Sequence, residues 1–256
     1  MAVNMGIILA IIAMVSWGFG DFLIQKSTRK FGDWETLLFI SLFGAIVLFP
    51  FIYKDLSLLF SSLNMTLIIL FLTSFVILFA ALLDFEALKR GKLCIVEPIY
   101  SLEIPVTAFL AYFILKETIN FYQIILIMFL VLGLFLLSLK SYHLKAKVWF
   151  EKGVLFVLFG TLFMGITNFL VGVSARETSS LMINWFMGVF LTIVCLIYLI
   201  YKGRIKKFDK NIWKQKKLIL SMSFLDNAAW IAFAFALTLD SMAIVTALSE
   251  SYIIIA

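Results

Sequence analysis

The sequence predicts an all-α polytopic membrane protein made of two inverted repeats of five helices, with ten spans expected and about nine present in this chain. Three observations carry this prediction. The chain is 64% hydrophobic and only 14% charged, whereas soluble domains are about 45–50% apolar and about 25% charged. Apolar runs of about 20 residues, the length that crosses a bilayer, recur along it. The two halves of the chain also resemble each other.

The composition excludes several other classes of protein. A disordered chain is polar, and this one has 28 Phe, 8 Tyr and 6 Trp. Its two cysteines, Cys94 and Cys195, both lie in apolar runs, and His143 is its single histidine. We therefore expect no disulfide framework and no metal site.

Eight apolar runs are long enough to span the bilayer. They cover 5–25, 34–53, 65–88, 93–115, 120–139, 153–174, 180–201 and 217–239. A ninth begins near Ser241 and continues to Ala256, which predicts that the natural chain extends further. Pro98 and Pro105 predict a kink in the fourth span. The longest connection, 202–216, leaves no room for a soluble catalytic domain.

The basic residues are distributed very unevenly. Eighteen of the 21 Lys and Arg residues fall on one side of the predicted membrane, and only Lys54, Lys116 and Arg176 fall on the other. The positive-inside rule places the basic side in the cytoplasm and the N-terminus outside. We expect a prokaryotic plasma-membrane protein whose positive charge contacts anionic lipid and binds no nucleic acid.

The internal repeat appears when the chain is shifted by 147 positions. Ten identities then occur over residues 6–48, Asp21 falls on Asn168, and Glu103 falls on Glu250. Five spans separate the copies, and an odd number inverts the second one, as in secondary transporters. The predicted repeats cover 1–140 and 148–256, the second being cut short in the ninth span.

Short motifs along the whole chain resemble the ten-span EamA-like members of the drug/metabolite transporter superfamily. The motifs are Trp17-Gly18, Phe85-Glu86-Ala87-Leu88-Lys89, Leu115-Lys116-Glu117, Leu132-Gly133-Leu134, and Trp230 with Ala236-Leu237. The resemblance implies a transporter, and favours export coupled to protons. Two features depart from the family: the repeat mate of Pro105 is Tyr252 or Ile253, and many relatives keep both termini in the cytoplasm.

Acidic residues inside the spans are the candidate functional groups. A charge at mid-membrane costs about 2.5–3.5 kcal/mol, and no Lys or Arg lies at matching depth. Helical spacing places Glu103, ten residues into its span, on one face with Tyr100 and Thr107, and Glu250 on one face with Thr246. We expect Glu103 and Glu250 to line a central cavity and to bind a cationic group, a proton, or both in turn. The alternative is a neutral acid that joins helices by hydrogen bonds.

The remaining candidates extend this site. Asp21, Asn168 and Asp226 lie within spans, and the mid-span rings of Trp17 and Trp230 could face a bound cation. The predicted substrate-binding or coupling set is Trp17, Asp21, Tyr100, Glu103, Asn168, Asp226, Trp230, Thr246 and Glu250. The expected substrates are amines, cationic drugs or amino acids, carried by a monomer or a homodimer.

Two other functions remain as hypotheses. The same carboxylates could serve a metal-ion facilitator. The sequence Gly18-Phe19-Gly20-Asp21 is similar to the Gly-x-Gly-Asp motif of intramembrane aspartyl proteases, which need a second aspartate such as Asp84 or Asp226. No Walker A pattern occurs, so we expect no ATP site, no cofactor and a transporter rather than an enzyme.

Overall fold

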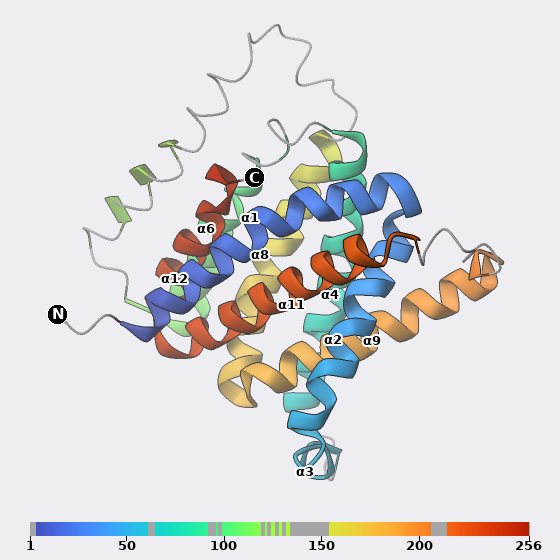
Figure 1. Cartoon of the computed structure of the whole chain (residues 1–256). Coiled ribbons are helices and arrows are strands. Elements are labelled where there is room, and N and C mark those ends of the chain that lie inside the picture. The colour runs from blue at the N-terminus through green and yellow to red at the C-terminus, as the bar shows by residue number, and fades with distance from the viewer. Residues whose placement is uncertain are drawn as a thin grey trace, which may run out of the picture.

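A computed structural model of the chain is helical throughout the part that it describes (Figure 1). The described residues are 4–60, 65–91, 99–118, 154–205 and 214–255, with a few single positions between 96 and 133. Six helices in this part are long and apolar enough to cross a membrane. They are α1 (Met5–Phe31), α2 (Asp33–Ile52), α4 (Met65–Arg90), α8 (Val154–Glu177), α9 (Ser180–Tyr201) and α11 (Lys216–Leu239). The predicted all-α polytopic fold is confirmed.

Four shorter elements complete the described structure. They are α3 (Leu56–Phe60), α6 (Glu103–Leu115), α12 (Met242–Ser249) and the 3-10 helix η3 (Glu250–Ile254). Most of the predicted fifth span, Pro98 and the predicted loop 140–152 lie outside the described residues.

Local capping explains where the long helices begin and end. The side chains of Asn4 and Ser179 accept hydrogen bonds from the backbone N–H of Gly6 and of Met182, which satisfies the free donors of the first turn. Helix α1 continues to Phe31, six residues beyond the predicted span, and stops at Gly32, whose φ of 109° favours glycine.

The fourth span, for which the sequence predicts a kink, is interrupted just before Glu103. A turn occupies Ser101 and Leu102, and Glu103 is the first residue of α6. Pro105 has no N–H to donate to the carbonyl of Ser101, and Ile104 N–H donates to that carbonyl instead at 3.2 Å. The break therefore lies where proline removes a helical hydrogen bond.

The ninth span is also divided into two helical elements. Helix α12 ends at Ser249, and Glu250 begins η3. The hydroxyl groups of Ser249 and Ser251 donate to the carbonyls of Thr246 and Ala247, and such bonds compete with regular helix geometry. Glu250 and Thr246 therefore belong to different elements, contrary to the prediction of one shared helical face.

The helices pack in pairs that relate the two halves of the chain. Helix α1 lies along α11, and its repeat equivalent α8 lies along α4, while α2 packs against α9 (Figure 1). A glycine marks two other equivalent crossings, that of α1 with the end of η3 and that of α8 with α6. A Cβ on Gly18 would lie 2.7 Å from Cβ of Ile255, and one on Gly165 would lie 2.7 Å from Cβ of Val106. This packing supports the inverted repeat, and its boundaries at 1–140 and 148–256 stay a prediction.

The same crossings correct the predicted pairing of Glu103 with Glu250. A Cβ on Gly18 would lie 3.3 Å from the carbonyl oxygen of Tyr252. A Cβ on Gly165 would lie 3.2 Å from the carbonyl oxygen of Glu103. Glu103 and Tyr252 are thus equivalent positions, two residues away from the uniform shift of 147. The two glutamates occupy different places in their repeats.

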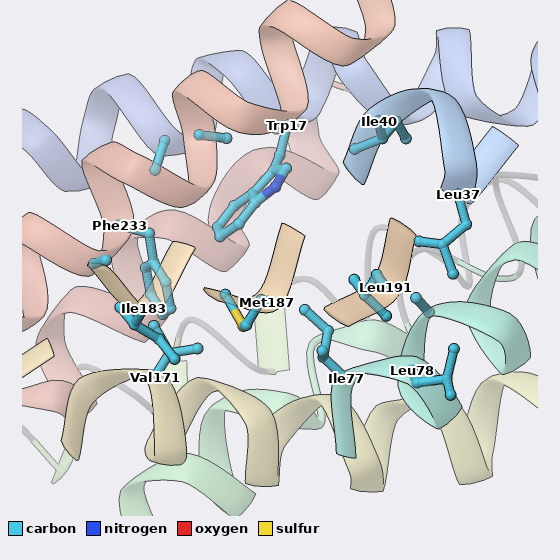
Figure 2. Close-up of a cluster of buried hydrophobic side chains, with 14 of the residues drawn as sticks. Trp17, Leu37, Ile40, Ile77, Leu78, Val171, Ile183, Met187, Leu191 and Phe233 are labelled. Atoms are coloured by element: carbon cyan, nitrogen blue, oxygen red, sulfur yellow. The ribbon is translucent and has the colours of Figure 1, made fainter. Parts of the chain in front are cut away.

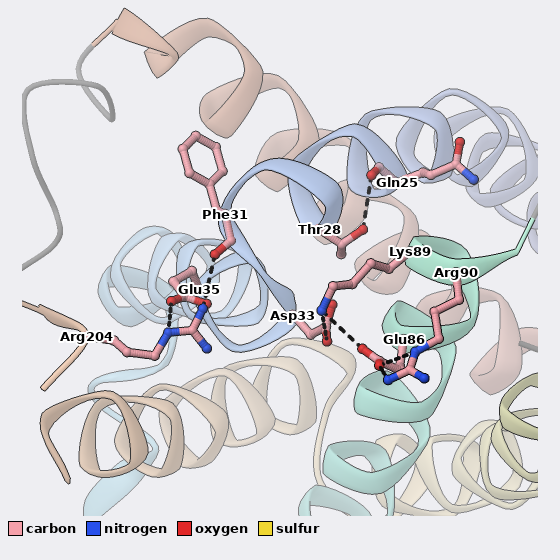
Figure 3. A network of polar contacts seen from close by, with 9 residues as sticks. All are labelled: Gln25, Thr28, Phe31, Asp33, Glu35, Glu86, Lys89, Arg90 and Arg204. Carbon is pink, nitrogen blue, oxygen red and sulfur yellow. Dashed lines mark hydrogen bonds and ion pairs between the residues drawn. The ribbon is translucent and has the colours of Figure 1, made fainter. Parts of the chain in front are cut away.

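Apolar side chains pack between the helices, while four of the five ion pairs in the described part of the chain lie at one end. Trp17, Ile77, Ile183, Met187 and Phe233 belong to one buried cluster (Figure 2). At the end where α1, α4 and α9 finish, here called the basic end, Lys89 pairs with Asp33 and Glu86, and Glu86 also pairs with Arg90. Arg204 contacts Glu35 at 2.9 Å there (Figure 3). This network ties α2 to α4 and α9.

Candidate functional site

A central cavity lies between the two halves and is partly open to the outside. Its lining comes from the second half of α1, the first turns of α2 and the second half of α4, all of which lie toward the basic end. Helices α8, α9 and α11 and the starts of α6 and η3 close the other sides. The cavity therefore reaches toward the basic end along α1, α2 and α4, while its lining on α9 lies in the half of that helix away from the basic end.

Carboxyl groups dominate the polar part of the lining. The acids are Asp21, Asp84, Glu103, Asp226 and Glu250, and none of the described lining residues is Lys or Arg. Three amides, Asn168, Asn184 and Asn227, also face the space. Such a cavity favours cationic groups and disfavours anions.

Glu103, Asn168 and Glu250 form its most buried polar group. Asn168, on α8, donates from Nδ2 to Oε2 of Glu103 at 3.1 Å and also pairs with Glu250. The three side chains are 4%, 1% and 3% exposed. Glu103 begins α6, so its carboxyl group lies near the positive end of that helix. Glu250 caps the C-terminal end of α12 through its backbone N–H.

A second group combines aromatic rings with half-buried carboxylates. The rings of Trp17 and Trp230 meet edge to face with centroids 5.2 Å apart, and Tyr252 lies 6.1 Å from Trp17. Asp21 follows Trp17 by one helical turn on α1, and Asp226 precedes Trp230 by one turn on α11. The hydroxyl of Tyr252 pairs with Asp21.

Asp84 joins the cavity through α4, although the sequence indicated it only as a partner for a protease. Its side chain is 6% exposed, and its Oδ1 accepts no hydrogen bond. This oxygen occupies a notch that Gly160 leaves on α8, because a Cβ on Gly160 would overlap it. The hydroxyl of Tyr100 donates to the backbone carbonyl of Asp84 at 3.1 Å and holds this part of α4 in place.

Eight of the nine predicted site residues line the cavity, and Thr246 does not. Thr246 is fully buried in α12, and its hydroxyl has no hydrogen-bond partner. The sequence-based prediction missed five polar lining residues: Ser41, Asp84, Asn184, Asn227 and Tyr252. Tyr252 could have been found from a repeat alignment with the correct offset, since it is the equivalent of Glu103. The functional roles of all these residues stay predictions.

Metal ligation was tested on the same geometry. Within the described ranges, no three or more His, Cys, Asp and Glu side chains are close enough to hold one metal ion. The carboxyl groups are spread around the cavity and do not converge on one point.

Comparison with protein families places the chain in a family of membrane transporters. The sequence model of the EamA-like transporter family matches residues 4–139, more than half of the chain. The comparison with curated proteins gives no match. The matched region contains the interrupted fourth span and the acids Asp21, Asp84 and Glu103.

Proposed function

Because the chain belongs to the EamA-like transporter family, we propose that this multi-pass membrane transporter of the drug/metabolite type exports small organic solutes that carry a positive charge. The single observation that supports the substrate charge most strongly is the cavity lining, which has five acids and no described Lys or Arg. An anionic solute would find no opposite charge there.

The coupling ion in this proposal is the proton. A carboxyl group removed from water favours its neutral, protonated form, and a bound cation favours the charged form. Glu103 and Glu250 share Asn168 and are almost fully buried. A cation entering the cavity would displace a proton from this pair, and protonation from the other side would release the cation. The exchange is antiport.

The direction follows from the basic residues. The positive-inside rule places the basic end in the cytoplasm and the N-terminus outside. The cavity extends toward that end. A cytoplasmic solute would enter there and leave on the opposite side of the cell membrane.

The test is transport in proteoliposomes on a solid-supported membrane. Transient currents are recorded for amines, lipophilic cations, amino acids and metal ions, with and without a proton gradient. We expect a pH-dependent current for organic cations that Glu103→Gln and Glu250→Gln remove. Glu86→Gln is the matched control, because Glu86 pairs with Arg90 at the basic end and does not line the cavity.

Each other outcome rejects a part of the proposal. Unchanged transport and pH dependence in both glutamine variants would reject coupling through Glu103 and Glu250. Currents carried by metal ions alone would favour the cation facilitator. Cleavage of membrane peptides that Asp21→Asn abolishes would favour the aspartyl protease.

A further inference from the structure

Building on the proposed transport function, we infer that one wall of the cavity binds an organic ammonium group. The wall consists of Trp17 and Asp21 on α1, Asp226 and Trp230 on α11, and Tyr252 on η3. We call it the ammonium wall. Helices α1 and α11 pack closely along their length, so these side chains are held by the most extensive contact between two helices described in the fold.

The aromatic rings of the wall have the arrangement of a partial cage. Trp17 lies 5.2 Å from Trp230 and 6.1 Å from Tyr252, measured between ring centroids, and all three line the cavity. The Trp17–Trp230 pair is nearly perpendicular, with an interplanar angle of 83°. Rings set at an angle can present faces to one bound cation from more than one direction.

Two carboxylates stand beside these rings. Asp21 and Trp17 are four residues apart on α1, as are Asp226 and Trp230 on α11, so each acid lies on the same helical face as its tryptophan. Asp21 and Asp226 are close enough to repel each other. Both are only partly buried, whereas Glu103 and Glu250 are almost fully covered. The half-buried pair is therefore the one a solute reaches first.

The opposite wall lacks this chemistry. Met164 and Asn168 on α8 stand where α1 has Trp17 and Asp21. The offset that relates Glu103 to Tyr252 also relates two residues of α4 to the acid and ring of α11. Ile77 is the equivalent of Asp226 and Ala81 is the equivalent of Trp230, and both line the cavity. The two pairs that each combine a tryptophan with an aspartate one turn away thus lie on one side of the cavity only, although Asp84 and Glu103 add carboxyl groups on the other side.

Asp84 adds a further acid to the cavity, although its unbonded Oδ1 lies against Gly160 on α8 and not at the ammonium wall. Asp84 lines the same cavity, is more than nine-tenths buried, and has a carboxyl oxygen without a hydrogen bond. Asp84 also interacts electrostatically with Asp21. A bound cation beside Asp21 would offset the repulsion among Asp21, Asp84 and Asp226.

The rings select the kind of cation. An organic ammonium is weakly hydrated and gains from contact with aromatic faces, while a small metal ion requires converging oxygen ligands. No such group of three ligands occurs among the described residues. The wall therefore fits an alkylated ammonium group better than an inorganic ion.

Binding is measured by isothermal titration calorimetry on the full chain in detergent, with benzyltrimethylammonium as the probe. Benzyl alcohol and benzoate are the neutral and anionic analogues. We expect the ammonium to bind about tenfold more tightly than benzyl alcohol, and benzoate not to bind. Asp226→Asn and Trp17→Leu should each weaken ammonium binding about tenfold.

Two control variants separate binding from general damage. Trp34→Leu removes a tryptophan that stacks on Tyr198 at 3.9 Å and does not line the cavity. Asp33→Asn removes an acid that pairs with Lys89 at the basic end. Both should bind the probe with unchanged affinity. If Trp17→Leu does not fold, Asp226→Asn, which keeps the side-chain shape, still decides the outcome.

Binding that does not distinguish benzyltrimethylammonium from benzyl alcohol, or that Asp226→Asn leaves unchanged, would overturn the inference. The binding experiment and the transport experiment can fail separately. If the chain binds the ammonium at this wall but shows no proton-dependent transport, the inference holds and the proposed proton coupling is wrong. If transport of another solute depends on Glu103 but the ammonium does not bind, the proposed coupling holds and the inference about the ammonium wall is wrong.

Discussion

Arg29 and Arg176 occupy equivalent positions in the two halves and make the same contact. Arg29, at the end of α1, donates to the carbonyls of Leu88 and Gly91 at 3.3 and 2.7 Å. Arg176, at the end of α8, donates to the carbonyls of Leu237 and Asp240 at 3.0 and 3.2 Å. Each arginine thus caps the third long helix of its own half.

Both contacts satisfy backbone carbonyls at the end of a helix. The last carbonyls of a helix have no partner within the helix, and a cation near them is favoured by the helix dipole. Arg176 reaches its two carbonyls with two nitrogens of the planar guanidinium, Nε and Nη2, whereas Nη2 of Arg29 donates to both of its carbonyls. The residues contacted in the two halves differ by the same offset that relates Glu103 to Tyr252. The arginine contacts and the glycine crossings therefore indicate one common repeat.

We predict that replacing either arginine by lysine destabilises the protein, by about 1–2 kcal/mol for each site. Lysine keeps the charge and cannot contact two carbonyls in the same geometry. The loss should be larger for Arg176, because it also pairs with Glu117 at 2.7 Å, and Glu117 accepts a hydrogen bond from Met242 N–H at the start of α12.

Thermal unfolding in detergent, followed by tryptophan fluorescence, measures both variants. Lys54→Gln, which removes an exposed basic residue outside these contacts, is the control and should melt like the parent chain. An Arg176→Lys variant as stable as the control would show that the carbonyl contacts contribute nothing to stability.

Much of the fold could be predicted from the sequence because membrane spans leave a strong signal. Long apolar runs must be helical in a bilayer, since no other single segment satisfies its backbone there. The breaks at Glu103 and Glu250 were harder to predict. Pro105 predicted a kink, but whether a proline bends or interrupts a helix depends on the other hydrogen bonds around it. The serine hydroxyls that bend the ninth span gave no clear sequence signal.

The cavity was predicted less completely. An acid inside a span is unusual, so Asp21, Glu103, Asp226 and Glu250 were recognised from depth alone. Asp84 lies four residues before the end of its predicted span, as Asp21 does in its own, and was considered only as a second protease aspartate. Its place in the cavity lining was found only from the structure. Glu103 was aligned with Glu250 because the shift of 147 found over residues 6–48 was applied to the whole chain. The structure shows that the equivalent of Glu103 lies two residues further along the chain, at Tyr252. The chance match of two glutamates hid this difference.

We predict that Gly18→Ala and Gly165→Ala each impair folding and transport. The new Cβ would lie 2.7 Å from Cβ of Ile255 or of Val106, and both neighbours are branched next to the backbone. Forcing the crossing apart costs about 1–3 kcal/mol, as for other overpacked sites. The melting temperature and the initial transport rate measure the effect.

Gly20→Ala is the matched control on the same helix. Its Cβ would meet only Cβ of Leu225, at 3.8 Å, an ordinary contact. We expect Gly20→Ala to be as stable as the parent chain. Equal effects at Gly18 and Gly20 would mean that close approach at the crossing is not the reason for glycine there.

The last prediction concerns the Gly160 notch and Asp84. Gly160→Ala should destabilise the protein by about 1–3 kcal/mol, because its Cβ would overlap Asp84 Oδ1 and force a buried carboxyl group to move. Asp84→Ala alone should change stability less, since the oxygen facing the notch makes no hydrogen bond. In the double variant the two alanines fit together, so the cost of Gly160→Ala should largely disappear. A double-mutant cycle of melting free energies measures this coupling. If the two substitutions are additive, Asp84 does not occupy the notch, and its carboxyl group must be sought elsewhere around the cavity.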